Sequence, residues 1–149
     1  MNPRKLSIRL LAGWFSIYAA SGIVALLFET GLLEKGVVQD TRTIFILQTV
    51  GVLISLAMIP VALGGFKKLM DRIEDRPLED RVRIYTVSSW LRIVAFFIVV
   101  VFGVALYYLI NDDIGLYCAV IGAICSMFSI PTRNTVEYDL DWDDDESDE

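Results

Sequence analysis

Uncharged apolar stretches dominate the pattern of residues along this chain. Four runs contain no Asp, Glu, Lys or Arg: Leu10–Phe28, Thr43–Phe66, Ile93–Ile110 and Ile114–Pro131. At about 1.5 Å of rise per residue, runs of roughly 18–24 residues match a hydrocarbon core of about 30 Å. The runs have almost no polar face, so a soluble helical protein would have nothing with which to cover them. We therefore predict transmembrane helices at about residues 9–29, 43–66, 86–110 and 114–131.

Together these helices predict an all-α membrane protein built as a single four-helix transmembrane bundle, residues 1–134. The composition agrees, since 55% of the 149 residues are hydrophobic and the mean hydropathy is +0.56. Residues 135–149 are expected to form a separate, disordered acidic tail.

Positive charge is unevenly distributed among the connections between the runs. Eleven of the 13 Lys and Arg residues lie on one side: Arg4, Lys5, Arg9, Lys67, Lys68, Arg72, Arg76, Arg81, Arg83, Arg92 and Arg133. The opposite side has only Lys35 and Arg42. The positive-inside rule therefore predicts that both termini are cytoplasmic, in what we take to be a bacterial plasma (inner) membrane. The net charge of −6 does not change this prediction, because Asp and Glu contribute little to orientation.

The segment between the second and third runs is predicted to extend both helices into a short cytoplasmic hairpin. An i, i+3, i+4, i+7 stripe continues the second helix through Phe66, Leu69, Met70 and Ile73. Pro77 ends this helix and can begin the next one. Two pairs have i, i+4 spacing for ion pairs, Lys67–Asp71 and Glu79–Arg83. We expect a solvated, salt-bridged hairpin, with a docking surface as the alternative.

The C-terminal end is strongly acidic, with nine Asp and Glu residues among positions 137–149. Such a segment is too charged to pack and is expected to be disordered. Tyr138, Leu140 and Trp142 alternate with Asp residues, a period of two that suits an extended peptide bound by a partner. The tail is therefore either a solubilising segment or a short docking motif.

Arg92 is the main candidate for a functional residue inside the membrane. Intramembrane charges are rare and often functional. Ser88 and Ser89 lie at i−4 and i−3, and Tyr85 lies one turn further toward the cytoplasm. Such a face could contact an anion or a lipid head group. Arg92 is only about 8 Å deep, however, so we expect its side chain to extend to the head groups, with the anion-binding face as the alternative.

Small and aromatic residues also recur within the runs. Rows of small or polar residues that would allow close helix packing within the bundle are Ala12, Ser16 and Ala20; Gln48, Gly51 and Ser55; Gly115, Ala119 and Ala123; and Cys118, Gly122 and Ser126. Two such rows on the fourth helix leave room for a partner helix as well. Trp14 and Trp90 are expected to belong to an interfacial aromatic belt.

The chemistry of catalysis is largely missing from the sequence. There is no His, and the two Cys residues, seven positions apart on one predicted helix, are too far apart to form a disulfide. No span contains a carboxylate, which argues against proton-coupled transport. We expect no enzyme, cofactor, metal site or nucleic-acid partner.

Our leading hypothesis is a non-catalytic accessory or scaffold subunit that acts through cytoplasmic or intramembrane partners, with a homo-oligomer as one form of this. The alternative is an oligomeric transporter or channel for an anionic or amphipathic substrate, with Arg92 lining its path.

Overall fold

Helices account for nearly all of the chain in the computed structural model, which describes residues 3–140. In order along the chain they are α1 (Pro3–Glu29), α2 (Thr41–Ile73), α3 (Leu78–Leu106), the π-helical turn η1 (Tyr107–Asn111), α4 (Asp113–Met127) and α5 (Arg133–Leu140). No strand occurs within this described part of the chain.

Three of the helices are long and apolar enough to cross a membrane. They cover 26, 33 and 34 residues, the last including η1. This confirms the prediction of an all-helical protein with apolar helices that are compatible with membrane spans. The fourth predicted span is different, because α4 has only 15 residues, about 22 Å. Its helix ends at Met127 rather than at Pro131, well short of a 30 Å core.

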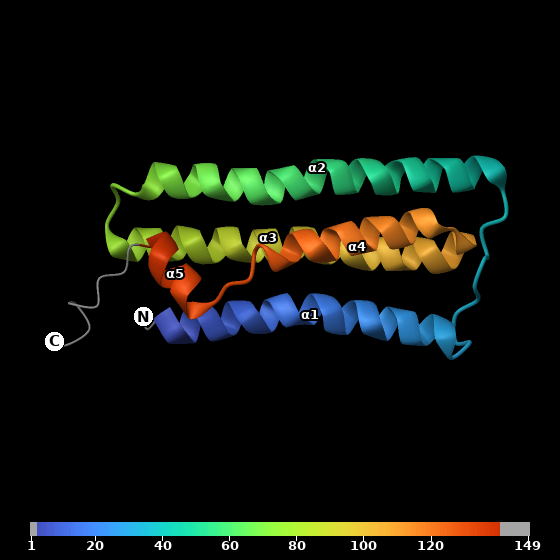
Figure 1. The fold of residues 1–149 in the computed structure, drawn as a ribbon, viewed down its shortest axis with the longest axis horizontal. Helices are drawn as coiled ribbons and strands as arrows, with labels where there is room; N and C mark the ends of the chain where they lie inside the picture. Colours follow the sequence, from blue (N-terminus) through green and yellow to red (C-terminus); the bar gives the residue numbers. More distant parts are fainter. Residues whose placement is uncertain (1–2, 141–149) are drawn as a thin grey trace.

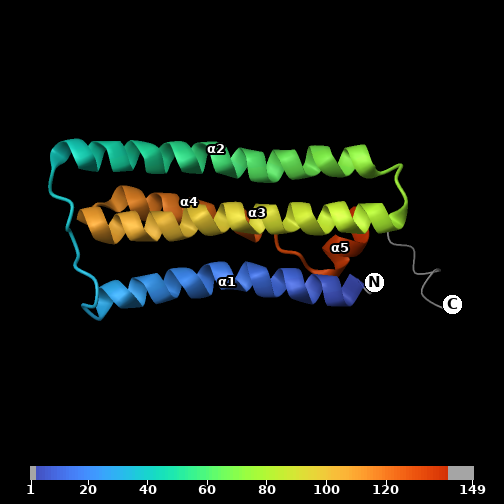
Figure 2. The same ribbon diagram turned by 180° about the vertical axis from the view of Figure 1, so that it is seen from behind.

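The long helices lie side by side, with α3 between α1 and α2 (Figures 1 and 2). α4 lies over one face of α3, so that it appears in front of α3 in one view and behind it in the other. α3 is therefore the central helix, and it packs against α1, α2, α4 and α5. It also has the most buried residues of any helix, including Tyr85, Phe96 and Val99.

The α3–α4 hairpin is held together by direct backbone contact. A Cβ atom added to Gly103 would lie 2.7 Å from the Ala119 nitrogen and 2.9 Å from the Gly115 carbonyl oxygen. A Cβ on Gly115 would likewise collide with the Tyr107 nitrogen and the Gly103 oxygen. The predicted small-residue packing of the fourth helix is thus confirmed at Gly115 and Ala119, and its neighbours Cys118, Gly122 and Ser126 are also buried.

The small residues of α1 do not pack as predicted. Ala12 and Ser16 are exposed on the outer side of α1, and Ala20 is only half-buried. On α2, in contrast, Gly51 is buried against the Leu106 side chain. The prediction that all these rows lie within the bundle is therefore wrong for α1, because larger side chains on its other face, Leu10 and Ile17, form its contact with the core.

The connections at the two ends are short and hydrogen-bonded. The loop before α2 is tied to η1 by the bond from the Gly36 nitrogen to the Tyr108 oxygen, 2.9 Å. Asp40 caps α2 by accepting bonds from the nitrogen and hydroxyl of Thr43, which hold the pKa of the Asp40 carboxyl below its usual value. At the other end, α5 and the start of α1 lie near the α2–α3 turn (Figure 1).

The prediction of a disordered tail from residue 135 onward is wrong for its first six residues. Residues 135–140 belong to α5, where the Val136 side chain is fully buried and Arg133 forms an ion pair with Glu137 at 2.6 Å. The high acidity of this segment suggested disorder, but one apolar side chain fixes the helix to the core at the end of the bundle. Residues 141–149 lie outside the described residues.

We expect Gly103→Ala to destabilise the hairpin, because the new methyl group meets backbone atoms that cannot rotate away. Overpacking of this kind costs about 1–3 kcal/mol. Thermal unfolding of the purified protein in mild detergent measures the effect. Gly64→Ala is the matched control, since a Cβ there meets nothing within 4 Å. Equal melting temperatures for the two variants would contradict the close α3–α4 contact.

Candidate functional site

The most unusual feature of the interior is the end of α4. The chain leaves the helix at Phe128 and continues without regular structure to Thr132 before α5 begins. The last carbonyl groups of a helix lack partners within that helix, and irregular backbone in an apolar medium must bond elsewhere in the protein. The positions of the donors around this segment therefore define the candidate site.

Two aromatic side chains of α1 donate to the last turn of α4. The indole Nε1 of Trp14 donates to the Ser126 carbonyl oxygen at 3.0 Å. The Tyr18 hydroxyl donates to the Ala123 oxygen at 3.2 Å and lies 2.7 Å from the Ser126 hydroxyl. The two rings contact each other edge to face, with centroids 4.8 Å apart. Trp14 is buried, so its expected place in an interfacial belt is wrong; its N–H is used inside the protein.

Two further side chains bond the irregular segment that follows. The Ser7 hydroxyl of α1 donates to the Pro131 oxygen at 3.0 Å. The Arg92 Nη2 of α3 lies 3.5 Å from the Ser129 oxygen, and its guanidinium carbon lies 3.9 Å from the centre of the Phe66 ring of α2. A cation beside the C-terminal end of a helix also interacts favourably with the helix dipole. Arg92 thus connects α3, α2 and the segment after α4.

The four residues predicted to contact an anion or a lipid head group, Tyr85, Ser88, Ser89 and Arg92, do not all lie on the same face of α3. Tyr85, Ser89 and Arg92 share the interior face of α3, and Tyr85 and Ser89 are fully buried. Ser88 instead lines an open groove between α2 and α3. Within the described residues, the hydroxyl groups of Ser89 and Ser129 are buried without a hydrogen-bond partner. The predicted anion site remains a prediction, but its residues do not converge on one surface.

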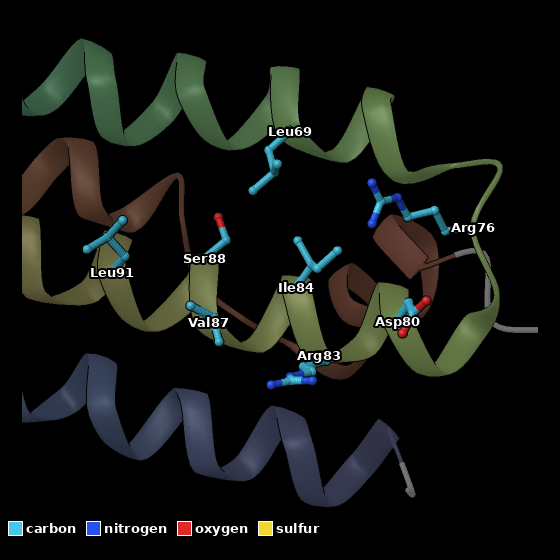
Figure 3. Close-up of a pocket in the computed structure, with 8 residues that line it drawn as sticks. All are labelled: Leu69, Arg76, Asp80, Arg83, Ile84, Val87, Ser88 and Leu91. Atoms are coloured by element: carbon cyan, nitrogen blue, oxygen red, sulfur yellow. The ribbon is translucent and has the colours of Figure 1, made fainter.

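The groove that contains Ser88 lies near the α2–α3 turn and has a volume of about 440 Å³. Figure 3 shows Leu69 from α2 and Ile84 and Ser88 from α3 pointing into the space between the helices. Its remaining lining residues are Arg76, Asp80, Arg83, Val87 and Leu91. The groove could not be predicted from the sequence, where Arg83 is expected to pair with Glu79 within a salt-bridged hairpin.

Those ion pairs do not form. Within residues 3–140, neither Lys67 with Asp71 nor Glu79 with Arg83 makes the predicted salt bridge. Arg81, in contrast, donates from Nη1 to the Glu74 carbonyl oxygen at 3.2 Å, across the α2–α3 turn. The hairpin is therefore joined partly by side chain to backbone bonding, which leaves Arg83 available at its surface.

A second groove, of about 480 Å³, runs between α2 and α4 and is lined mainly by aliphatic side chains, with Pro60, Tyr117 and Cys118 among them. Both Cys118 and Cys125 are free thiols. No group of three or more His, Cys, Asp or Glu residues able to hold a metal occurs in the described part of the chain.

The three residues predicted to dock a partner are Tyr138, Leu140 and Trp142, and the structure describes only the first two. Tyr138 lies on α5 with 87% of its surface exposed. Leu140 is the last residue of this helix, so positions 138–140 are helical rather than extended as predicted. Trp142 lies outside the described residues.

Comparisons with known proteins add no relationship. No protein-family model matches this sequence, and no curated protein or solved structure has a significant match to it.

We expect Arg92→Met to destabilise the protein by about 1–3 kcal/mol, because it removes both the bond to Ser129 and the contact with the Phe66 ring. Arg72→Met is the matched control: Arg72 lies exposed in the last turn of α2 and should change stability by no more than about 0.5 kcal/mol. Thermal unfolding in mild detergent compares the two. An unchanged Arg92→Met protein would show that the arginine does not hold this segment.

Proposed function

We propose that this chain is a non-catalytic integral membrane protein that acts as an accessory or scaffold subunit through partner proteins. Three of its helices are compatible with crossing a membrane. Its interior polar groups mostly bond to the chain's own backbone, as at Ser7, Trp14 and Arg92. This use of polar side chains supports a structural role for the interior and directs attention to the outer faces.

The charge distribution supports an orientation with both ends in the cytoplasm. α5, the start of α1 and the α2–α3 turn lie at one end of the molecule (Figure 1). Eleven Lys and Arg residues belong to this side of the sequence, against Lys35 and Arg42 at the other. We place this end in the cytoplasm of a bacterial cell, following the positive-inside rule.

The observation that carries the proposal is how little of α2 is buried. Only four of its 33 residues are buried: Gly51, Ala62, Phe66 and Ile73. Its outer side exposes Ala57 and Val61 next to Gly64 and Gly65, around which nothing lies within 4 Å of an added Cβ. Small residues on an exposed transmembrane face allow a second helix to approach closely. We propose that a partner helix, from another protein or a second copy, packs there.

The transporter alternative depends on Arg92 lining a substrate path. Its guanidinium lies against the Ser129 carbonyl and the Phe66 ring, contacts within the chain itself. This geometry favours the accessory role over transport.

A photo-crosslinking side chain at Val61 should form a protein adduct in membranes, because Val61 lies on the exposed glycine-containing face of α2. The same group at Phe15, exposed on α1, should react mainly with lipid. Gly64→Leu combined with Gly65→Leu should reduce the Val61 adduct about tenfold by blocking helix approach, a loss of about 1.4 kcal/mol. Gly22→Leu, at the open glycine of α1, should not reduce it.

Adduct size after denaturing electrophoresis distinguishes a second copy from another protein. Lipid adducts alone at Val61, or an adduct that survives the double leucine replacement, would contradict the proposal of a partner on α2.

The acidic segment after α5 is a second proposed contact. Replacing residues 141–149 by a neutral Gly/Ser segment of the same length keeps α5 and its buried Val136 intact. If the segment docks a cytoplasmic protein, co-purification in mild detergent should fall at least about tenfold. If the segment only solubilises the chain, aggregation should rise while co-purification is unchanged.

A further inference from the structure

The groove between α2 and α3 combines a charged rim with an apolar wall. Arg76, Asp80 and Arg83 form the rim near the α2–α3 turn. Further along α3, the lining is mainly aliphatic at Ile84, Val87 and Leu91, with Ser88 among them and Leu69 facing them from α2 (Figure 3). The groove is open to the surface of the protein.

The two arginines of the rim have no side-chain partner among the residues that the structure describes. Among residues 3–140, the guanidinium groups of Arg76 and Arg83 form neither a hydrogen bond nor an ion pair. They differ in this from Arg81 and Arg92 of the same end, which bond to backbone carbonyl oxygens. Two unpaired cations beside an apolar groove are complementary to an anionic group attached to a hydrocarbon chain.

The charged residues of the groove lie toward one end of α3 and its apolar residues toward the other, as a phospholipid head group is followed by its acyl chains. From Arg83 to Leu91 the helix rises about 12 Å, the distance from a head group to the first part of the acyl chains. Ser88 lies between Val87 and Leu91 and offers one hydroxyl within this apolar part. Val87 and Leu91 are 64% and 71% exposed, so the apolar wall faces the bilayer.

The carboxylate of Asp80 limits the charge that the rim accepts. With Arg76 and Arg83 it gives the rim a net charge of +1, which one phosphodiester neutralises. A lipid with a second negative charge would be repelled by Asp80. A hydroxyl-bearing head group, in contrast, could donate a hydrogen bond to this carboxylate.

We propose that this groove binds one anionic phospholipid, with its phosphodiester at the rim of Arg76 and Arg83 and an acyl chain along Leu69, Val87 and Leu91. The site belongs to the leaflet at the α2–α3 turn. It does not depend on a partner at α2, so it can be tested on the isolated protein.

Native mass spectrometry of the full chain, released from mild detergent, tests the site directly. The protein is titrated with phosphatidylglycerol and, separately, with phosphatidylcholine of the same acyl chains. We expect one phosphatidylglycerol to bind about tenfold more tightly than phosphatidylcholine, and Arg76→Gln with Arg83→Gln to remove most of this preference. Asp80→Asn should increase it.

The matched control is Lys68→Gln with Arg72→Gln, which removes the same charge from exposed positions of α2 outside the groove. This control should keep the preference. Ser88→Phe should also lose lipid binding, because it fills the groove without changing charge, and its melting temperature shows whether it is folded.

Three results would overturn the proposal. The two lipids could bind equally, the control could lose the preference as fully as the Arg76 and Arg83 variant, or millimolar glycerol 3-phosphate could displace the lipid. The last result would identify a site for soluble phosphate compounds and not for a lipid.

Discussion

The hydrogen-bonding requirement of the carbonyl groups at the end of α4 is the constraint on which the rest of the structure depends. An unsatisfied backbone carbonyl buried in a protein interior costs about 1–3 kcal/mol. α4 is only 15 residues long, so its last turn and the segment to Thr132 meet this requirement inside the protein. Trp14, Tyr18, Ser7 and Arg92 provide the donors. These bonds fix α1 and α3 around α4 in one register.

The division of roles among the helices follows from this constraint. α3 contacts α4 directly through backbone at Gly103 and Gly115, and α1 reaches α4 with long polar side chains. α2 provides no donor to the end of α4; its contribution there is the ring of Phe66 against Arg92. α2 therefore has a small buried fraction for its length, with four buried residues of 33. An exposed face with open glycines on this helix is consistent with assembly, whereas an equally exposed α1 would compromise the bonds to α4.

The features that could be predicted from the sequence depend on local pattern, and those that could not depend on tertiary contacts. The three long helices follow from the length of charge-free runs, a property of the chain in one dimension. The run from Ile114 to Pro131 is equally apolar, yet its helix ends at Met127, because donors on α1 and α3 make an early end tolerable. Arg92 could be identified as unusual from its position alone. Its partner, the Ser129 carbonyl, could not, since that atom becomes available only when α4 ends early. Residues 135–140 similarly gained a helix from one buried contact at Val136.

The arginines at the α2–α3 end, which the positive-inside rule counts as equivalent, differ in what they can do. Arg81 and Arg92 bond to backbone carbonyl oxygens, so their charge is used to hold a turn and a helix end. If the guanidinium group of Arg81 or Arg92 turned to bind a ligand, a backbone carbonyl oxygen would lose its donor. The free energy lost would be comparable to the free energy gained from the ligand. Among residues 3–140, Arg76 and Arg83 make no such bond, so their full interaction with an anionic group is available for binding. Binding at this end should therefore depend on the arginines in the groove and not on Arg92, even though Arg92 lies deeper in the apolar part of the sequence.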